Sequence, residues 1–409
     1  MQSNYKRLGD YIREVNIRNK GLKDYPLLGV SIQKKLMPSI ANTIGTDMST
    51  YKLIKRNQFA YGPVTSRNGE KISIALADQY ENALLSQAYT VFEVIDENEL
   101  HPEYLMMWFK RAEFDRYARF MSHGSAREIF SWAEMCEVLL PIPSPEKQLE
   151  IVREYNVVQN RIKLNNQFIA KLEETAQAIY KQWFVDFEFP NENGLPYKSS
   201  GGEMNWQQKL NKELPIEWTS TILNDLVNNQ NPITYGVVKP GDIVLNGVKF
   251  IRSGDLKSGQ ILFPQLRTIS LEISGQYKRT KLSGGEIVIS IVGNPGQIAL
   301  VPSFLAGANI ARQVAVVKPH NSKVALYLKN YLISIQGQET LRDITIGSVQ
   351  EVINLEDLRN IIISIPKQDV LNKYDILASS FERHLQLNYR INEELMLLKE
   401  LVLSKMTKI

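Results

Sequence analysis

A long stretch in the middle of the chain repeats apolar residues at helical spacing. From residue 145 to residue 186 they recur at alternating intervals of four and three, and neither proline nor glycine occurs between Glu146 and Phe189. A heptad pattern of this kind is typical of a long helix that pairs with another helix. About 40 residues would form a helix roughly 60 Å long. The seam consists of Ile151, Tyr155, Val158, Ile162, Asn165, Ile169, Leu172, Ala176, Ile179 and Trp183.

The last part of the chain carries a second seam of the same kind. Asn165 and Asn388 occupy equivalent positions in the two seams, and a buried asparagine costs stability but fixes the register of paired helices. We therefore predict that the two helices pair antiparallel and that the two asparagines set their register. The alternative is a slightly hydrated position in an ordinary helical hairpin. The second seam consists of Tyr374, Leu377, Phe381, His384, Asn388, Ile391, Leu395, Leu398 and Val402.

The rest of the chain mixes strand and helix patterns. Residues 89–95, 285–292 and 314–317 are rich in apolar and β-branched side chains, which predict strands. Residues 101–121 and 324–335 have apolar positions at helical spacing, which predict helices. Each half of the chain mixes these strand and helix patterns, and we predict an α+β fold for both.

The chain also repeats itself once. A shift of 223 residues aligns Tyr104-Leu105 with Tyr327-Leu328 and continues without a gap to the C-terminus. Upstream the match is looser and needs small gaps. We predict a duplicated domain: two globular domains joined by two long antiparallel helices that form a coiled-coil spacer, with an internal pseudo-two-fold repeat. The same shift aligns Arg119 with Arg342, Gly124 with Gly347, Glu128 with Glu351, Pro143 with Pro366, and Asn165 with Asn388.

The predicted boundaries follow from the repeat and from proline and glycine positions. A linker is expected after the first long helix because Pro190 to Pro196 and Ser199 to Gly202 are unlikely to form regular structure. The expected parts are a first domain at 1–143, a central helix at 144–189, a linker at 190–210, a second domain at 211–366 and a C-terminal helix at 367–409.

Composition excludes several classes of protein. The 409 residues are 44% hydrophobic and 22% charged, with a formal net charge of +4, as in an ordinary globular protein. A single cysteine, Cys136, excludes an internal disulfide framework, and the four histidines are too far apart for a structural zinc site. The N-terminal sequence lacks a secretory signal and no apolar run is long enough for a membrane helix. We therefore expect a cytoplasmic protein.

Common catalytic motifs are absent. The sequence contains neither a phosphate-binding loop nor a dinucleotide-binding glycine motif. Asn294-Pro295-Gly296 is superficially similar to the Asn-Pro-Pro-aromatic motif of amino-methyltransferases, but it lacks the second proline and the aromatic residue. We predict no catalytic residues and no metal site. A stand-alone enzyme with dispersed catalytic residues is the alternative.

Two basic tracts, one in each predicted domain, suggest a polyanionic partner. Residues 34–71 contain seven lysines and arginines against two acidic residues, and residues 235–281 contain eight against three. Lysine and arginine contact phosphates, while asparagine, glutamine, serine and tyrosine can contact base edges. The tracts favour DNA binding, and the alternative is an ordinary solvated surface.

The segment from Ala178 to Pro190, Ala-Ile-Tyr-Lys-Gln-Trp-Phe-Val-Asp-Phe-Glu-Phe-Pro, resembles the central region of the specificity subunit of Type I restriction-modification enzymes. Residues 142–148, 233–238, 249–256 and 387–398 are similar to the same family. The resemblance implies that two target-recognition domains read the two halves of a split sequence in double-stranded DNA. It implies no catalytic site and no cofactor in this chain. It also implies two modification (methyltransferase) subunits that use S-adenosylmethionine, and restriction subunits that use ATP and Mg.

Loop residues of the basic tracts are the predicted DNA contacts. Arg127 follows the repeated Gly-Ser turn and aligns with Gln350 in the second copy, a difference that would let the two domains read different bases. The predicted contacts are Lys34, Lys35, Lys55, Arg56, Tyr61, Ser66, Arg67, Asn68 and Arg127 in the first domain, and Tyr235, Lys239, Arg252, Lys278, Arg279, Asn294, Arg312 and Gln313 in the second.

An aromatic cluster at the end of the central helix is a candidate docking surface for the modification subunits. It contains Trp183, Phe184 and Phe187, and its alternative interpretation is packing of a helix end. Two further functions stay open for the whole chain. One is a structural adaptor that does not bind DNA, and the other is the recognition subunit of another multisubunit restriction system.

Overall fold

The chain folds into two compact units. The computed structural model describes residues 5–41, 44–66, 68–124, 127–228, 233–257, 259–263 and 266–407. Unit 1 comprises Met1–Leu164 with Glu394–Ile409, and unit 2 comprises Asn165–Glu393. Each unit holds strands, short helices and a part of both long helices, α4 (Pro145–Phe184) and α9 (Gln368–Lys405). The predicted α+β fold is confirmed, with the division between units falling inside the long helices.

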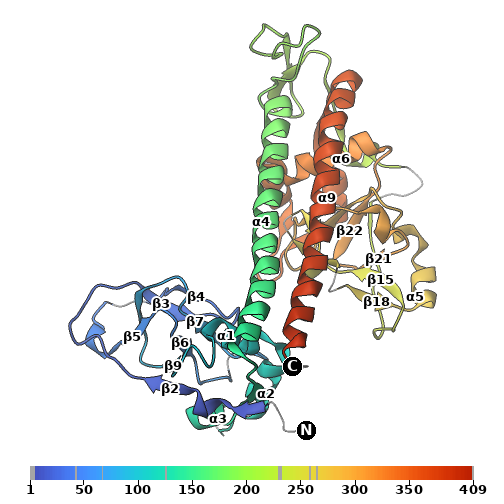
Figure 1. Cartoon of the computed structure of the whole chain (residues 1–409). Helices are drawn as coiled ribbons and strands as arrows, with labels where there is room; N and C mark the ends of the chain where they lie inside the picture. Colours follow the sequence, from blue (N-terminus) through green and yellow to red (C-terminus); the bar gives the residue numbers. More distant parts are fainter. Residues whose placement is uncertain are drawn as a thin grey trace. The chain divides into compact units, whose positions relative to one another are not determined.

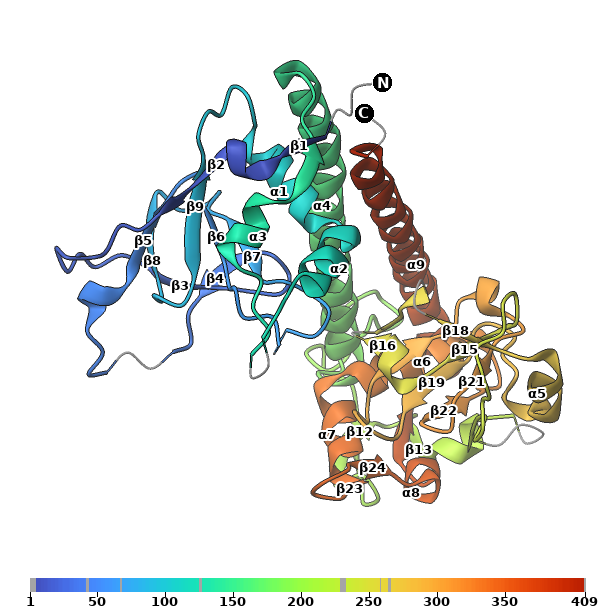
Figure 2. The same cartoon turned by 90° about the horizontal axis from the view of Figure 1, so that it is seen from below.

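Unit 1 is built on two four-stranded sheets (Figure 2). The first has the order β2-β9-β6-β7 with antiparallel neighbours, and the second has the order β4-β3-β8-β5 with β3 and β8 parallel. Apolar strand residues such as Phe59 and Phe92 fill the core of the unit. The strands are β1 (Tyr5–Arg7), β2 (Ile12–Val15), β3 (Leu27–Val30), β4 (Leu36–Pro38), β5 (Lys52–Lys55), β6 (Phe59–Tyr61), β7 (Ile74–Leu76), β8 (Asn82–Leu85), β9 (Thr90–Val94) and β10 (Leu139–Pro141).

The short α-helices of unit 1, within its described residues, are α1 (Pro102–Lys110), α2 (Ala112–Phe120) and α3 (Trp132–Cys136). The sequence predicted a single helix over 101–121. The helix is broken at Arg111, whose backbone is extended with φ −71° and ψ 141°. The break lets the buried faces of α1 and α2 pack separately against the same core.

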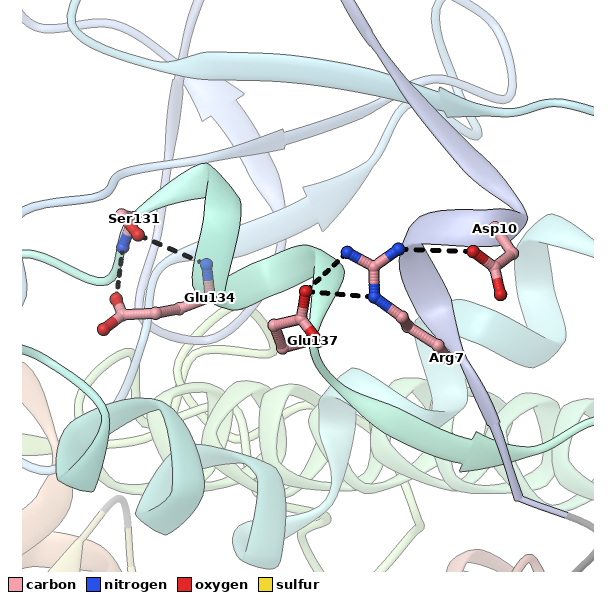
Figure 3. Close-up of polar contacts among 5 residues, drawn as sticks. All are labelled: Arg7, Asp10, Ser131, Glu134 and Glu137. Atoms are coloured by element: carbon pink, nitrogen blue, oxygen red, sulfur yellow. Dashed lines mark hydrogen bonds and ion pairs between the residues drawn. The ribbon is translucent and has the colours of Figure 1, made fainter.

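Polar contacts join the first strand to α3 (Figure 3). Ser131 caps the helix: Glu134 N donates to Ser131 Oγ at 3.2 Å, and Ser131 N donates to Glu134 Oε2 at 2.9 Å. This reciprocal capping box satisfies two main-chain donors that would otherwise lack partners. Arg7, at the end of β1, donates from Nε to Glu137 Oε1 at 3.0 Å and from a terminal nitrogen to Asp10 Oδ1 at 3.2 Å. The end of α3 is thereby held beside β1.

Unit 2 has the same kinds of elements. One sheet has the order β14-β22-β19-β20, and another has the order β18-β15-β21 with β15 and β21 parallel. Its α-helices are α5 (Leu271–Gln276), α6 (Ser322–Ile333), α7 (Ile335–Asp343) and α8 (Leu355–Arg359). Its strands are β11 (Met204–Gln207), β12 (Lys212–Pro215), β13 (Thr219–Ile222), β14 (Thr234–Tyr235), β15 (Val248–Ile251), β16 (Leu256–Lys257), β17 (Gln260–Ile261), β18 (Arg267–Ile269), β19 (Ile287–Ser290), β20 (Ile298–Leu300), β21 (Asn309–Ile310), β22 (Val314–Val317), β23 (Thr345–Ile346), β24 (Val352–Ile353) and β25 (Ile362–Ile365).

The internal repeat is visible in individual contacts. Tyr104 donates its hydroxyl to Pro141 O at 2.9 Å, and Tyr327 donates to Ser364 O at 2.5 Å. A shift of 223 residues relates both partners, and it also superimposes the bounds of α2 on α7 and of α3 on α8. The two copies therefore share a scaffold built from the same buried bonds, as the sequence predicted.

The two long helices pair antiparallel inside each unit (Figure 1). In unit 1, Lys405 Nζ donates to Glu154 Oε2 at 2.9 Å, and Val402 packs in the same core as Tyr155. In unit 2, the rings of Tyr180 and Tyr374 lie 6.3 Å apart. All ten predicted seam residues of α4 are buried or half-buried, which confirms that seam.

The seam predicted for α9 is partly wrong. Leu377 and Leu398 are 39% and 44% exposed, whereas Ala378, Leu385 and Asn392 are buried. On a straight α-helix, positions seven residues apart differ in direction by about 20°. The residues that face the partner helix therefore move away from the heptad positions as the helix continues. The first turns of α9 also pack into the core of unit 2, which selects a different face there.

The segment after α4 packs against unit 2. Phe189 stacks on Tyr197 and Trp218, with ring centroids 4.7 and 5.5 Å away. Phe187 has a left-handed backbone, φ +61°, which ends the helical direction of the chain. Part of the predicted linker 190–210 is regular, because β11 pairs with β12 in an antiparallel hairpin.

Candidate nucleic-acid interface

Two of the predicted contact residues in unit 1 lie in its interior. Lys34 occupies a left-handed turn position, φ +62°, and only 6% of its side chain is exposed. Its ammonium lies 2.8 Å from Asp115 Oδ1 and donates to the main-chain oxygen of Phe109. Burial lowers the pKa of this ammonium, and Asp115 opposes that effect. Lys34 thus forms an internal ion pair instead of the exposed loop charge that the sequence predicted.

Tyr61 is the second interior residue. It belongs to β6 and is fully buried among the aromatic side chains of unit 1, including Phe92 and Phe130. Burial raises the pKa of its phenol. The prediction named Tyr61 among the loop residues, but strand β6 includes Tyr61, whose side chain lies in the core.

The other predicted contacts of unit 1 lie at its surface. Arg56 is paired with Glu81 at 2.6 Å, and Asn68 donates to Val64 O at 3.2 Å. Arg67 lies outside the described residues. The exposed side chains that have no hydrogen-bond or ion-pair partner among the described residues are Lys35, Lys55, Ser66 and Arg127.

In unit 2, one predicted contact is already engaged. Arg252 donates from Nε to Asp255 Oδ2 at 3.0 Å and from a terminal nitrogen to Asp255 Oδ1 at 2.7 Å. This two-bond pairing raises the pKa of Arg252, and it uses Nε and one terminal nitrogen of the guanidinium. Arg252 therefore holds the start of the short turn Ser253–Asp255.

The remaining predicted contacts of unit 2 are at the surface or close to it. Tyr235 and Asn294 are exposed, and Gln313 is half-buried. The exposed cations without a hydrogen-bond or ion-pair partner among the described residues are Lys239, Lys278, Arg279 and Arg312.

The structure adds exposed cations that the prediction passed over. Lys249 lies on β15 and Arg267 on the neighbouring β18, where Phe250 pairs with Arg267. Lys281 directly follows the 3-10 turn Lys278–Thr280. All three belong to the basic tract at 235–281, but the prediction favoured loop residues. The alternation of exposed Lys249 with buried Phe250 was the available signal for a charged strand edge.

The asparagines of the long helices form a buried network in unit 2. Asn165 Nδ2 donates to Asn388 O at 2.8 Å and to Asn392 Oδ1 at 2.9 Å. Asn392 Nδ2 in turn donates to Asn166 Oδ1 at 2.7 Å, while the side chain of Asn388 donates to His384 O of its own helix. The predicted pair therefore meets through one side chain and one main-chain oxygen. Asn392, which the sequence analysis missed, supplies the second side chain.

The aromatic cluster predicted to dock partner subunits is buried. Trp183, Phe184 and Phe187 are 7%, 2% and 6% exposed and belong to the core of unit 2. Phe184 contacts the ring of Tyr374 at 4.6 Å, so the aromatic residues join α4 to α9. Because these side chains are buried, they do not form an exposed docking surface. Their contacts agree with the alternative interpretation, in which they pack the end of the helix.

The described residues contain no group of three or more His, Cys, Asp or Glu side chains that could hold a metal ion. None of the described helices is long and apolar enough to cross a membrane.

Comparisons with known proteins agree with the two-unit repeat. A family model described as the Type I restriction modification DNA specificity domain matches residues 11–174 and 215–396. The specificity subunit of the Type I restriction enzyme EcoBI from Escherichia coli is 38% identical over 154 residues, 37% of this chain and 32% of that protein. The MjaIX specificity subunit from Methanocaldococcus jannaschii is 26% identical over 298 residues, 70% of this chain and 63% of that protein. The chain thus spans less than two thirds of either relative.

A solved structure supports the fold. The crystal structure of a Type I restriction-modification system S subunit from M. genitalium has a TM-score of 0.55 and 13% sequence identity, covering 98% of this chain and 95% of that one. At this identity the likeness concerns the fold alone. The family model, however, matches both halves of the chain over most of its length. The chain belongs to the family of Type I restriction modification DNA specificity domains.

Proposed function

We propose that this chain is the sequence-specific DNA-recognition subunit of a Type I restriction-modification complex and that it reads a bipartite target. The observation that carries the proposal is one turn that occurs twice. Gly124 and Gly347 have φ +137° and +101°, and a Cβ on either would lie 2.1 or 2.3 Å from the main-chain oxygen of Arg127 or Gln350. The same glycine-dependent turn therefore presents an exposed arginine in one unit and an exposed glutamine in the other.

These two side chains have different preferences for bases. Arginine pairs with guanine through two hydrogen bonds, whereas glutamine pairs with adenine. A shared scaffold with unlike tips is the arrangement that two unlike half-sites require. Each unit also carries exposed cations that have no hydrogen-bond or ion-pair partner among the described residues, and these would supply the sequence-independent attraction to phosphates.

Docking of modification subunits belongs to the same proposal. The long helices carry apolar side chains that face solvent although their seams are already filled. Leu164 and Leu387 occupy equivalent positions and are 59% and 53% exposed, each next to a buried asparagine. Exposed apolar residues beside buried asparagines favour a partner that covers the solvent-facing side of each helix. The other exposed large apolar residues among the described positions are Val157 and Phe168 on α4, and Ile376, Leu377, Met396, Leu397, Leu398 and Leu401 on α9.

In this proposal the chain recognises DNA and does not itself catalyse a reaction. Adenine methylation would come from the modification subunits with S-adenosylmethionine, and DNA cleavage from restriction subunits with ATP and Mg. The recognition subunit would hold these partners at a fixed position on the DNA.

The test is co-expression of the chain with its modification subunits, followed by sequencing of methylated adenines across the host genome. We expect one motif with two defined halves and an unread spacer of constant length. Methylation without any motif, or no binding to DNA in the presence of the partners, would favour a structural adaptor. Methylation or cleavage by the purified chain alone would favour a stand-alone enzyme. A motif read by a complex that cuts on both sides of its target would indicate another multisubunit restriction system.

A further inference from the structure

A shallow notch in unit 2 gathers positive charge, and none of its described lining residues is acidic. It has a volume of about 290 Å³ and is lined by Lys249, Lys281, Phe304 and residues 305–308, together with Val248. Its three walls come from β15, from the chain after the turn Lys278–Thr280, and from the segment before β21. The two lysines are far apart in sequence, so only the fold brings them to one place.

The two lysine charges of the notch lack a compensating partner among the described residues. Both lysines are exposed, and neither ammonium has a hydrogen-bond or ion-pair partner among the described residues. A third cation lies close by: the guanidinium of Arg390 is 5.7 Å from the centre of the Phe304 ring. Like charges that share a notch repel one another, and an anion placed between them removes that repulsion and adds attraction to both.

The frame of the notch is fixed. Gly307 N donates to Leu282 O at 2.8 Å, and Leu282 N donates to Ala308 O at 2.8 Å. Ala306 N is also occupied, donating to Ser303 O at 3.0 Å. Because these amides are used within the frame, an anion would be held by the lysine ammoniums, whose flexible stems can follow it. The ring of Phe304 is 48% exposed and is held by Phe263, 4.7 Å away in an edge-on arrangement.

We propose that this notch binds a phosphodiester group of the DNA backbone. The proposal rests on the proposed function and names a site within it. Lys281 directly follows the turn Lys278–Thr280, in which Lys278 and Arg279 are exposed cations without a hydrogen-bond or ion-pair partner among the described residues, and the sequence predicts both as DNA contacts. The notch therefore lies next in sequence to two predicted phosphate contacts, as expected of a group that fixes the register of a protein on the duplex.

The test uses the complex with its modification subunits and a double variant, Lys249→Gln with Lys281→Gln. Affinity for target and non-target duplexes is measured over a range of salt concentrations. Each phosphate contact adds about 0.9 to the slope of log affinity against log salt, so we expect the slope to fall by up to about 2. The affinity ratio between target and non-target DNA should stay the same, because a phosphate carries no sequence information.

Two matched variants make the result specific. Lys198→Gln with Lys209→Gln removes two other exposed lysines of unit 2 that have no partner among the described residues, and it should leave the slope unchanged. Lys249→Arg with Lys281→Arg keeps the charge and should keep the slope. An unchanged slope in the notch variant, while the unmodified complex binds DNA normally, would overturn the proposal.

The experiment also separates other outcomes. If the unmodified complex does not bind DNA at all, the proposed function fails, not the notch alone. If inorganic phosphate stabilises the protein through these lysines while the DNA slope does not change, the notch is a site for a free anion and the proposal is wrong.

Discussion

Asn165 donates a hydrogen bond to the main-chain oxygen of Asn388 at 2.8 Å, and the two residues are 223 positions apart, the period that relates the two halves of the chain. Equivalent residues of two antiparallel helices come together only where the local two-fold axis of the helix pair passes between them. The buried asparagines therefore mark that axis for α4 and α9. Any slip of one helix along the other would leave Asn165 and Asn392 without partners in an apolar seam.

Asn165→Ala should lower the free energy of unfolding by about 1–3 kcal/mol, because Asn388 O and Asn392 Oδ1 would lose a donor while remaining buried. Thermal or denaturant unfolding of the chain measures the effect. Asn160→Ala is the matched control, since Asn160 is exposed on the same helix and has no hydrogen-bond partner among the described residues. An effect of Asn165→Ala no larger than that of the control would contradict a role for the network.

The variant Asn165→Leu with Asn392→Leu should behave differently. Replacing both partners with apolar residues leaves fewer unsatisfied polar atoms, so stability should recover at least in part, while the penalty against helix slippage disappears. We expect methylome sequencing to find targets with more than one spacer length. A single unchanged spacer length would show that the network does not set the register.

The spacer length should also follow the length of the helices. Glu173 accepts a hydrogen bond from Tyr389 at 2.5 Å, and the stretch around Leu385 faces this part of α4. Four residues inserted after Glu174, matched by four inserted after Arg383, should add about 6 Å of helix and lengthen the unread DNA by one or two base pairs. The two half-sites should stay the same. Recovery of the original spacer in the methylome would exclude a measuring role for the helices.

Much of the fold could be predicted from the sequence, because the two domains and the two long helices arise from residue patterns that recur along the chain. The period of 223 predicted Asn165 opposite Asn388, and the heptads of α4 predicted its buried stripe. The contact residues followed less well, because burial of a polar side chain depends on distant partners. The local pattern predicts Lys34 as a loop charge, whereas the fold buries it beside Asp115, and the pairing of Arg252 with Asp255 is not predicted by the sequence either. Counting lysines and arginines predicts that a surface is positively charged, but it does not predict which of these side chains already form ion pairs within the protein.

Lys34 and its neighbour Lys35 test this distinction directly. Lys34→Ala should destabilise unit 1 by about 3–5 kcal/mol, because it would leave the buried Asp115 carboxylate without its cation. Lys35→Ala, at an exposed position without an ion-pair partner among the described residues, should leave stability nearly unchanged and lower the salt dependence of DNA binding by about one unit of slope. Unfolding and binding experiments on the two variants should give opposite patterns. Equal stability of both would mean that the internal pair contributes little.

Docking of the modification subunits should depend on the exposed leucines of the long helices. Leu164→Arg with Leu387→Arg should weaken binding of these subunits by at least about tenfold, since charged groups would have to be buried on an apolar contact. The fold should persist because both side chains face solvent. Ala170→Arg is the control, at an exposed position on another face of α4. Pull-down and titration with the purified modification subunit measure the effect, and equal binding by all three proteins would place the docking surface elsewhere.

The two copies of the glycine turn give the sharpest test of recognition. Arg127→Gln makes the tip of unit 1 like that of unit 2, where Gln350 stands. We expect a loss of about 1–3 kcal/mol in discrimination at one base pair of one half-site, without any change in the other half. Gln350→Arg should produce the reciprocal change in the opposite half-site. Because the turn depends on Gly124 and Gly347 rather than on these side chains, both variants should fold normally.

The measurement is binding to duplexes with every single substitution in each half, alongside the methylome of each variant. If Arg127→Gln weakened binding to all duplexes equally and reduced the salt slope by about one, Arg127 would contact a phosphate, and the bases would be read by other residues of unit 1.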